Sequence, residues 1–187
     1  MEKMLQAEIW TVVQAGDGNA VLLRPQNQNV AVPIFIGQLE IQSILIGKES
    51  ISLPRPLTHD LLLNLVDSLN LVLDRVEIHE IKDSTFHARL VITGGAYSAR
   101  APLILDSRPS DALGLAARRK CPILISEEIV SETGISLELF INALKHDSTT
   151  QEEKREKLIE RLNKAVEMEE YEQAAKIRDL LKDMEQD

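Results

Sequence analysis

Apolar segments separated by turn-forming residues run from the start of the chain to Ser131, and no other feature limits the possible folds as strongly. The segments are rich in Val, Ile and Leu, and the turns between them include Gly16-Asp17-Gly18-Asn19 and Lys82-Asp83-Ser84. Short β-branched runs bounded by such turns are typical of strands. We therefore expect strands at residues 4–14, 20–24, 29–36, 71–81, 85–93, 97–106 and 122–125.

Helical periodicity appears between the expected strands. The spacing of apolar residues predicts a helix over residues 38–46, closed by Gly47. Another helix is predicted over residues 109–120, because Pro109 suits a first helical turn and Ser107 can cap it. Shorter helices are expected over residues 127–131 and 137–145.

The helix between these begins after the proline-rich loop Pro54-Arg55-Pro56. Thr58 is its expected cap, and Asp60 lies in the first turn, where a negative charge suits the helix dipole. Its expected buried stripe consists of Leu61, Leu62, Leu65, Val66 and Leu69. Together the elements predict an α+β fold, with mixed and antiparallel sheets and a few packed helices. Because only 3% of the residues are aromatic, Leu, Ile and Val must fill its core.

The last part of the chain has a different composition. Residues 152–187 contain no proline or glycine and carry apolar residues at helical spacing in two stretches, which predicts a helical hairpin. We expect an α+β domain over residues 1–134, a helix and linker over 135–151, and the hairpin over 152–187.

The net charge of −9 works against sequence-independent binding of nucleic acid. Residues 1–146 hold 13 basic and 17 acidic side chains, and residues 147–187 hold 8 and 13, so neither part is basic. The single cysteine, Cys121, excludes an internal disulfide, and we expect it to be a buried, inert thiol. The chain starts without a signal-like segment and lacks the ~20-residue apolar stretch of a membrane span, so we expect a cytoplasmic protein with no membrane partner.

Four runs occur in the order seen in the bifunctional nuclease domain family. They are Pro33 to Gly37 with Glu40, Arg55 to Asp60, Asp83 with Thr85 to Ala88, and Asp106 to Ala112. The chain resembles this family over roughly residues 4–131, which implies an α+β domain with nuclease activity on DNA and RNA. One departure is His87, where the family more often carries a tyrosine.

The tail resembles the UVR motif of the excision-repair proteins UvrB and UvrC. The resemblance rests on Leu162, Ala165, Val166, Tyr171 to Ala175, Arg178 and Asp179. It implies a helical hairpin that mediates contact with another protein.

Phosphodiester cleavage needs an activated water and groups that stabilise charge on the phosphate oxygens. The side chains that suit proton transfer are His59, Asp60, Asp106 and Asp111, and those that suit phosphate binding are Arg55 and Arg108. A divalent metal, Mg²⁺ or Mn²⁺, is expected at Glu40 and Asp106. His59 is expected to face a cleft, because it starts a helix after a proline-rich loop.

Structural alternatives apply to the same residues. Asp60 can be a first-turn helix charge only, and Arg108 can pair with a carboxylate at a structural corner. The basic run Arg118-Arg119-Lys120 is interpreted as a solvated helix C-terminus.

Two functions compete on these grounds. The first is a nuclease of low sequence selectivity that cleaves RNA or DNA with help from a metal. The alternative is a non-catalytic, homo-oligomeric scaffold whose tail binds a protein partner. The acidic charge favours the scaffold, and the family resemblance favours the nuclease.

Overall fold

The computed structural model describes residues 3–15, 18–95 and 101–142, together with Leu158, Ile159, Leu162, Ala175, Lys176 and Arg178. The chain divides into two compact units, Met1–Leu137 and Glu138–Asp187. The fold described below is that of the first unit.

The first unit is built on one eight-stranded sheet with the order β6-β5-β4-β7-β1-β2-β3-β8. The strands are β1 (Met4–Ala15), β2 (Gly18–Pro25), β3 (Val30–Ile36), β4 (Leu71–Lys82), β5 (Thr85–Gly94), β6 (Leu103–Ser107), β7 (Ile123–Ser126) and β8 (Ile135–Ser136). Neighbouring strands are antiparallel except β4 and β7, which are parallel. The predicted α+β fold with a mixed sheet is confirmed.

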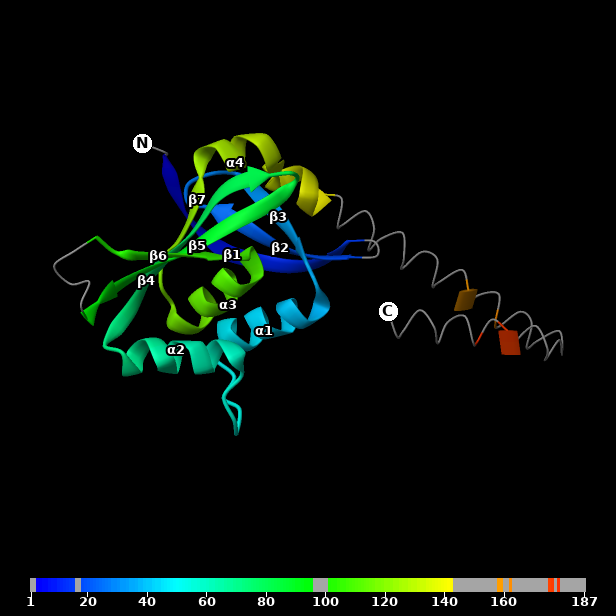
Figure 1. The fold of residues 1–187 in the computed structure, drawn as a ribbon. Coiled ribbons are helices and arrows are strands. Elements are labelled where there is room, and N and C mark those ends of the chain that lie inside the picture. Colours follow the sequence, from blue (N-terminus) through cyan, green and yellow to red (C-terminus); the bar gives the residue numbers. More distant parts are fainter. Residues whose placement is uncertain are drawn as a thin grey trace. The chain divides into compact units, whose positions relative to one another are not determined.

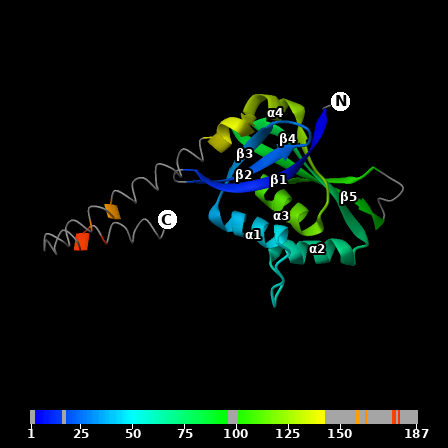
Figure 2. The ribbon, with the colours of Figure 1, turned by 180° about the vertical axis from the view of Figure 1, so that it is seen from behind.

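Three helices lie together on one side of this sheet (Figures 1 and 2). They are α1 (Gln38–Lys48), α2 (Thr58–Ser68) and α3 (Pro109–Arg119). The short helix α4 (Glu127–Thr133) lies on the other side in both views. The largest fully buried side chains of the described residues are aliphatic ones such as Leu22, Ile44 and Leu113, as the low aromatic content predicts.

Three helix ends differ from the prediction. Gly47 does not end α1 but packs against α3, where an added Cβ would lie 3.0 Å from Cγ of Arg118. Thr58 is the first residue of α2 and not its cap; instead, the N–H of Leu57 donates to Oδ2 of Asp60 at 2.9 Å. The N-cap of α3 is likewise Arg108, and Ser107 makes no capping bond.

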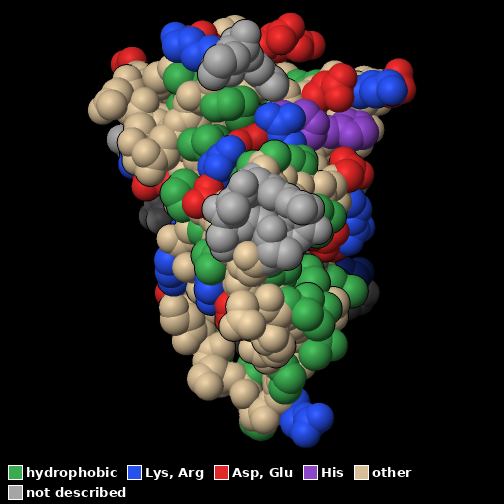
Figure 3. Space-filling view, turned by 60° about the vertical axis from the view of Figure 1, so that its left-hand side comes forward, with side chains coloured by type: hydrophobic (Ala, Val, Ile, Leu, Met, Phe, Trp, Pro, Cys, Tyr) green, Lys and Arg blue, Asp and Glu red, His purple; other side chains and the backbone are tan. Residues whose placement is uncertain are grey.

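The predicted buried stripe of α2 is wrong. Only Val66 of that helix is buried, whereas Leu61 is 62% exposed, Leu65 54% and Leu69 58%. Figure 3 shows hydrophobic side chains gathered on the surface at the lower end of one face, around α2 and the loop before it. The helix therefore places on the surface a stripe that the sequence pattern assigns to the core.

Some predictions fall partly outside the described residues. Residues 137–142 of the expected helix 137–145 are helical, and the expected strand 97–106 is described from Leu103 onward. The described positions of the tail are helical, but the predicted hairpin lies outside the described residues, so it and the linker boundaries stay predictions. No helix within the described ranges is long and apolar enough to cross a membrane.

Candidate functional site

A groove of about 380 Å³ opens where the end of β3, the start of α1, the β4–β5 turn and the start of α3 meet. Its lining residues are Ile34, Phe35, Ile36, Gly37, Glu40, Ser84, Thr85, Phe86, Arg108, Pro109 and Ser110. The β4–β5 turn is tight, because Asp83 and Ser84 both have positive φ angles. Four segments far apart in the sequence thus form one concave site of the size that small ligands occupy.

A carboxylate from each of two helices flanks Arg108 at this groove. Nε of Arg108 donates to Oδ2 of Asp111 at 2.9 Å, and Nη1 lies 3.7 Å from Oε1 of Glu40. The hydrogen bond to Asp111 and that residue's charge raise the pKa of the Arg108 guanidinium. Glu40 and Asp111 each occupy the third position of a helix, so both carboxylates lie in a first helical turn beside Arg108.

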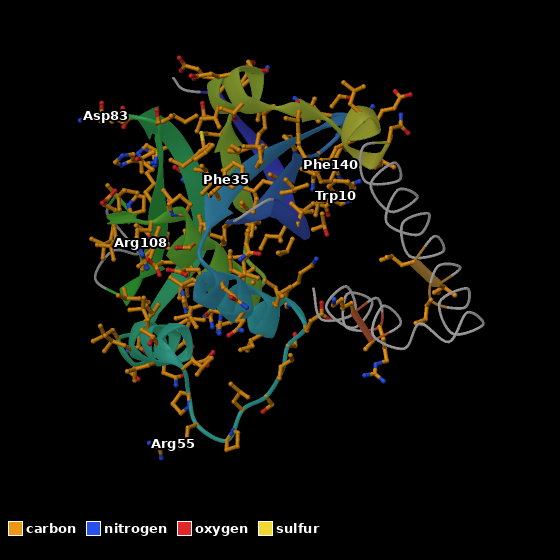
Figure 4. The ribbon with its side chains drawn as sticks, turned by 90° about the vertical axis from the view of Figure 1, so that its right-hand side faces the viewer. Trp10, Phe35, Arg55, Asp83, Arg108 and Phe140 are labelled. Carbon is orange, nitrogen blue, oxygen red and sulfur yellow. The ribbon has the colours of Figure 1, made fainter. Side chains whose placement is uncertain are left out.

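Two phenylalanines line the same groove, and one of them is exposed. Phe35 is 66% exposed, although aromatic residues are rare in this chain. Figure 4 shows Phe35 and Arg108 near each other, while Arg55 lies at the tip of the loop between α1 and α2, well away from both. The groove therefore combines an aromatic face, a cation and a carboxylate, and Arg55 is not part of it.

His59 lies behind the groove, between helices, and does not line it. Its Nδ1 is 2.9 Å from Oγ of Ser43, and Nε2 faces Oδ1 of Asp111 at 3.7 Å. Burial lowers the pKa of His59, and the Arg118 charge lowers it further against the opposing effect of Asp111. At neutral pH the imidazole is therefore neutral and packs against Asp111 without forming an ion pair with it. The structure does not place His59 at this groove, so the expectation that it faces a cleft stays a prediction.

Asp60 is bound by Arg118 of α3. The Arg118 side chain is 7% exposed; its Nε donates to Oδ1 of Asp60 at 2.7 Å, and Nη1 donates to the carbonyls of Ser43 and Gly114. Burial opposes the ionisation of Asp60, but the Leu57 N–H and Arg118 outweigh it, so the pKa of Asp60 is lowered. The interpretation of Arg118 as a solvated residue is wrong, because this side chain connects α1, α2 and α3.

Comparison of the sequence with known protein families identifies the family of this chain. The profile of the bifunctional nuclease domain matches residues 21–138, a range that contains every lining residue of the groove. The chain belongs to this family.

Two kinds of relative show how far the family resemblance extends. An uncharacterized protein of Mycobacterium tuberculosis is 32% identical over 124 residues, which are 66% of this chain and 71% of that protein. Bifunctional nuclease 1 of Oryza sativa subsp. japonica is 22% identical over 120 residues, which are 64% of this chain and 36% of that protein. The Bifunctional nuclease of Oryza minuta matches to the same extent.

In this bifunctional nuclease domain, Asp106 lies apart from the groove. Leu105 lines an apolar depression with residues of α2 and α3, so by strand alternation Asp106 points to the other face of the sheet. There it is directly opposite Arg89 of β5, which donates to the buried carboxylate of Glu77. The structure does not bring Asp106 together with Glu40.

The described part of the domain offers few ligands for the expected metal ion. No group of three or more His, Cys, Asp or Glu residues that could hold a metal ion occurs among the described residues. Glu40 and Asp111 at the groove are both turned toward Arg108, which competes for their oxygens. The residues present do not fit a metal held by protein side chains alone, and the expected pairing of Glu40 with Asp106 is not seen.

The thiol of Cys121 is not poised to act as a nucleophile. Burial raises the pKa of this half-buried thiol to about 11, so it stays protonated at neutral pH. The expectation of an inert thiol agrees with this geometry.

Gly114 makes room for His59 in the middle of α3. A Cβ at this position would lie 2.7 Å from Nε2 of His59 and 3.0 Å from its Cδ2. An isolated glycine inside a helical pattern signals a close approach, and this signal could have been found in the sequence.

We predict that Gly114→Ala lowers the free energy of unfolding by about 2 kcal/mol, because the methyl group clashes with the His59 ring. In a His59→Ala background the clash is absent, and the same Gly114→Ala change should then be neutral or stabilising by up to about 1 kcal/mol, as alanine is the better helix former. Urea denaturation of the four proteins measures both steps. Equal costs in the two backgrounds would contradict this account of Gly114.

Proposed function

We propose that the protein is a nuclease that cleaves RNA or DNA with low sequence selectivity at the groove beside Arg108. The observation that carries the proposal is the Glu40–Arg108–Asp111 cluster, placed at a groove with an exposed aromatic ring in a bifunctional nuclease domain. The names of the rice and Oryza minuta relatives support the same activity.

Each residue of the cluster has a chemical task in this proposal. The guanidinium of Arg108, whose side chain is 69% exposed, binds a non-bridging phosphate oxygen and stabilises the charge that develops there. As the attacking water bonds to phosphorus and the P–O bond to the leaving sugar oxygen breaks, the Glu40 carboxylate accepts the water's proton, and solvent water protonates the leaving oxygen. Asp111 holds Arg108 in place, and His59 packs behind Asp111 as a positioning residue. Asp60 has a structural role through Arg118.

Low selectivity follows from the kind of contacts the groove offers. A nucleobase can stack on the exposed face of Phe35 whatever its identity, because every base has a π-face. Arg108 binds phosphate, which is the same at every nucleotide. We propose a single-stranded substrate, since a stacked base pair does not expose a base face to such a ring.

The proposal leaves a divalent cation as an added component and routes no step through it. Mg²⁺ is commonly held by one or two carboxylates together with substrate phosphates, so an ion brought by the substrate is compatible with Glu40. The test therefore includes metal and chelator arms.

The test is cleavage of fluorescent single-stranded RNA and DNA, with Mg²⁺, Mn²⁺ or EDTA, by the wild type and by Glu40→Gln. We expect Glu40→Gln to lose activity by about 100-fold, as for other lost general bases. Glu49→Gln is the matched control, because Glu49 is an exposed carboxylate at the opposite end of the same helix.

Activity that Glu40→Gln retains would place the reaction elsewhere in the protein. No cleavage by the wild type with either metal and either substrate would reject the nuclease.

The scaffold function is a second candidate, and the exposed leucines of α2 favour self-association. We also propose that the tail is a UVR-like hairpin that binds a protein partner, and that the protein acts in the cytoplasm. A pull-down with the full chain and with a chain truncated after residue 151 tests the role of the tail.

A further inference from the structure

Helix α3 begins at the groove, and no side chain caps its first turn. Its N-cap residue, Arg108, has no acceptor atom on its side chain, and its first residue, Pro109, has no N–H. The N–H of Ala112 donates to the carbonyl of Arg108, which is the first bond within the helix. The N–H groups of Ser110 and Asp111 precede that bond, so no carbonyl of the helix accepts from them.

The side chain of Ser110 is a second, independent sign of a ligand at this helix start. Ser110 is only 6% exposed, and it lines the groove together with Arg108 and Pro109. Its hydroxyl has no hydrogen-bond partner among the residues that the structure describes, whereas a buried hydroxyl normally has one. A ligand with acceptor oxygens would satisfy both this hydroxyl and the uncapped N–H groups.

The donors at the start of α3 suit a phosphate group. The N–H groups at a helix N-terminus and the helix dipole together favour an anion. The hydroxyl of Ser110 and the guanidinium of Arg108 line the same groove and supply donors of two further kinds. A phosphomonoester has three terminal oxygens to accept from these three kinds of donor, whereas a phosphodiester within a nucleic acid chain has only two non-bridging oxygens.

Two carboxylates at the groove limit which phosphates can bind. Glu40 and Asp111 both face Arg108, so the cluster sets one positive charge against two negative charges. The ligand must therefore be held by hydrogen bonds more than by net charge. The second pKa of a phosphomonoester is about 6, so one of its oxygens can carry a proton and donate to a carboxylate. A phosphodiester has no such proton at neutral pH.

We propose that the start of α3 is a binding site for a phosphomonoester, and that the groove holds one nucleoside monophosphate. The phosphate accepts from the hydroxyl of Ser110, from the N–H groups of Ser110 and Asp111, and from Arg108. The base stacks on Phe35, which lies near Arg108 (Figure 4). The groove volume of about 380 Å³ is at the lower end of the range of ligand pockets, so it suits one nucleotide and not a longer stretch of chain.

The nucleotide nature of this ligand rests on the proposed nuclease function. When water attacks the phosphate beside Arg108, that phosphate becomes a phosphomonoester on one of the two products. The donors at the start of α3 then hold the product, so nucleoside monophosphates should compete with the substrate.

The first test is isothermal titration calorimetry of the full chain in EDTA with AMP, the methyl phosphodiester of AMP, adenosine and inorganic phosphate. We expect AMP to bind about 10-fold more tightly than its methyl ester or inorganic phosphate, and about 100-fold more tightly than adenosine. Equal binding of AMP and adenosine, or no binding of AMP, would overturn the phosphate site. A methyl ester as tight as AMP would overturn the preference for a monoester, and inorganic phosphate as tight as AMP would overturn the nucleotide.

The second test removes the hydroxyl of Ser110. Ser110→Ala should weaken AMP binding about 10-fold, which corresponds to about 1.4 kcal/mol. The melting temperature should not fall, because the hydroxyl has no partner among the described residues. Ser107→Ala is the matched control: the Ser107 hydroxyl donates to the carbonyl of Arg108, outside the groove lining, so this variant should bind AMP like the wild type. A less stable Ser110→Ala protein with unchanged AMP affinity would show that the hydroxyl serves the fold only.

The third test locates the phosphate without any substitution. In NMR spectra of the backbone amides, AMP should shift the signals of Ser110 and Asp111 and leave that of Glu128, in the first turn of α4, in place. Shifts confined to other residues would overturn the site. These tests need no cleavage: AMP binding by a protein that cleaves nothing would reject the nuclease alone, and cleavage without AMP binding would reject this site alone.

Discussion

Arg118→Met should lower the free energy of unfolding by about 3 kcal/mol, measured by urea denaturation at neutral pH. The substitution removes a buried guanidinium, leaves the Asp60 carboxylate without its partner, and removes a donor from the Ser43 carbonyl. We place the loss at the lower end for a broken buried pair, because Asp60 is 35% exposed and water can solvate its carboxylate.

The neighbouring arginine provides the control for this prediction. Arg119 pairs with Asp67 through two hydrogen bonds, but both side chains are substantially exposed, at 32% and 48%. Arg119→Met should therefore cost less than about 1 kcal/mol. Equal costs for the two substitutions would show that Arg118 does not connect the three helices in the way its contacts indicate.

Arg108→Ala should reduce nuclease activity by about 100-fold, because one charged donor to the developing phosphate charge is lost. The Arg108 side chain is 69% exposed, and exposed ion pairs such as those with Glu40 and Asp111 stabilise a fold by less than about 1 kcal/mol, so the variant should fold with a nearly unchanged melting temperature. Arg108→Lys should recover only part of the activity. Lysine keeps the charge, but it lacks the several N–H groups of a guanidinium that can bind Asp111 and phosphate at the same time.

The same assay separates the two arginines that the sequence offers for phosphate. Arg55 is exposed at the tip of the loop before α2, away from the groove (Figure 4). We expect Arg55→Ala to change cleavage less than about threefold, by loss of a distant charge only. A larger loss in Arg55→Ala than in Arg108→Ala would show that the substrate lies along this loop and not in the groove.

Local sequence patterns predicted most of the fold. The strands other than β8, the β4–β5 turn and the start of α3 follow from alternation, turn residues and Pro109, which act over a few neighbouring residues. The groove-side residues Glu40, Arg108 and Asp111 were also among the candidates, and the structure places them together.

The burial of individual side chains and the direction in which they point were predicted wrongly from the sequence. The leucines of α2 have the spacing of a buried stripe. Whether another element covers them depends on the whole fold and cannot be read from the helix alone. Arg118 lies in a basic run typical of a solvated helix end, yet it donates hydrogen bonds to Ser43 of α1 and Asp60 of α2. Asp106 is adjacent to the groove in sequence, but one step along a strand reverses the face to which a side chain points.

By itself, the sequence determined the class of fold, the turns and the family to which the chain belongs, because these depend on local periodicity and on specific runs of residues. Only the tertiary structure decided which candidates share a site, that His59 packs behind the groove, and that α2 leaves its leucines exposed. The physical reason is that burial, distance and pKa depend on residues brought together from distant parts of the chain, and one residue's neighbours in sequence do not specify them.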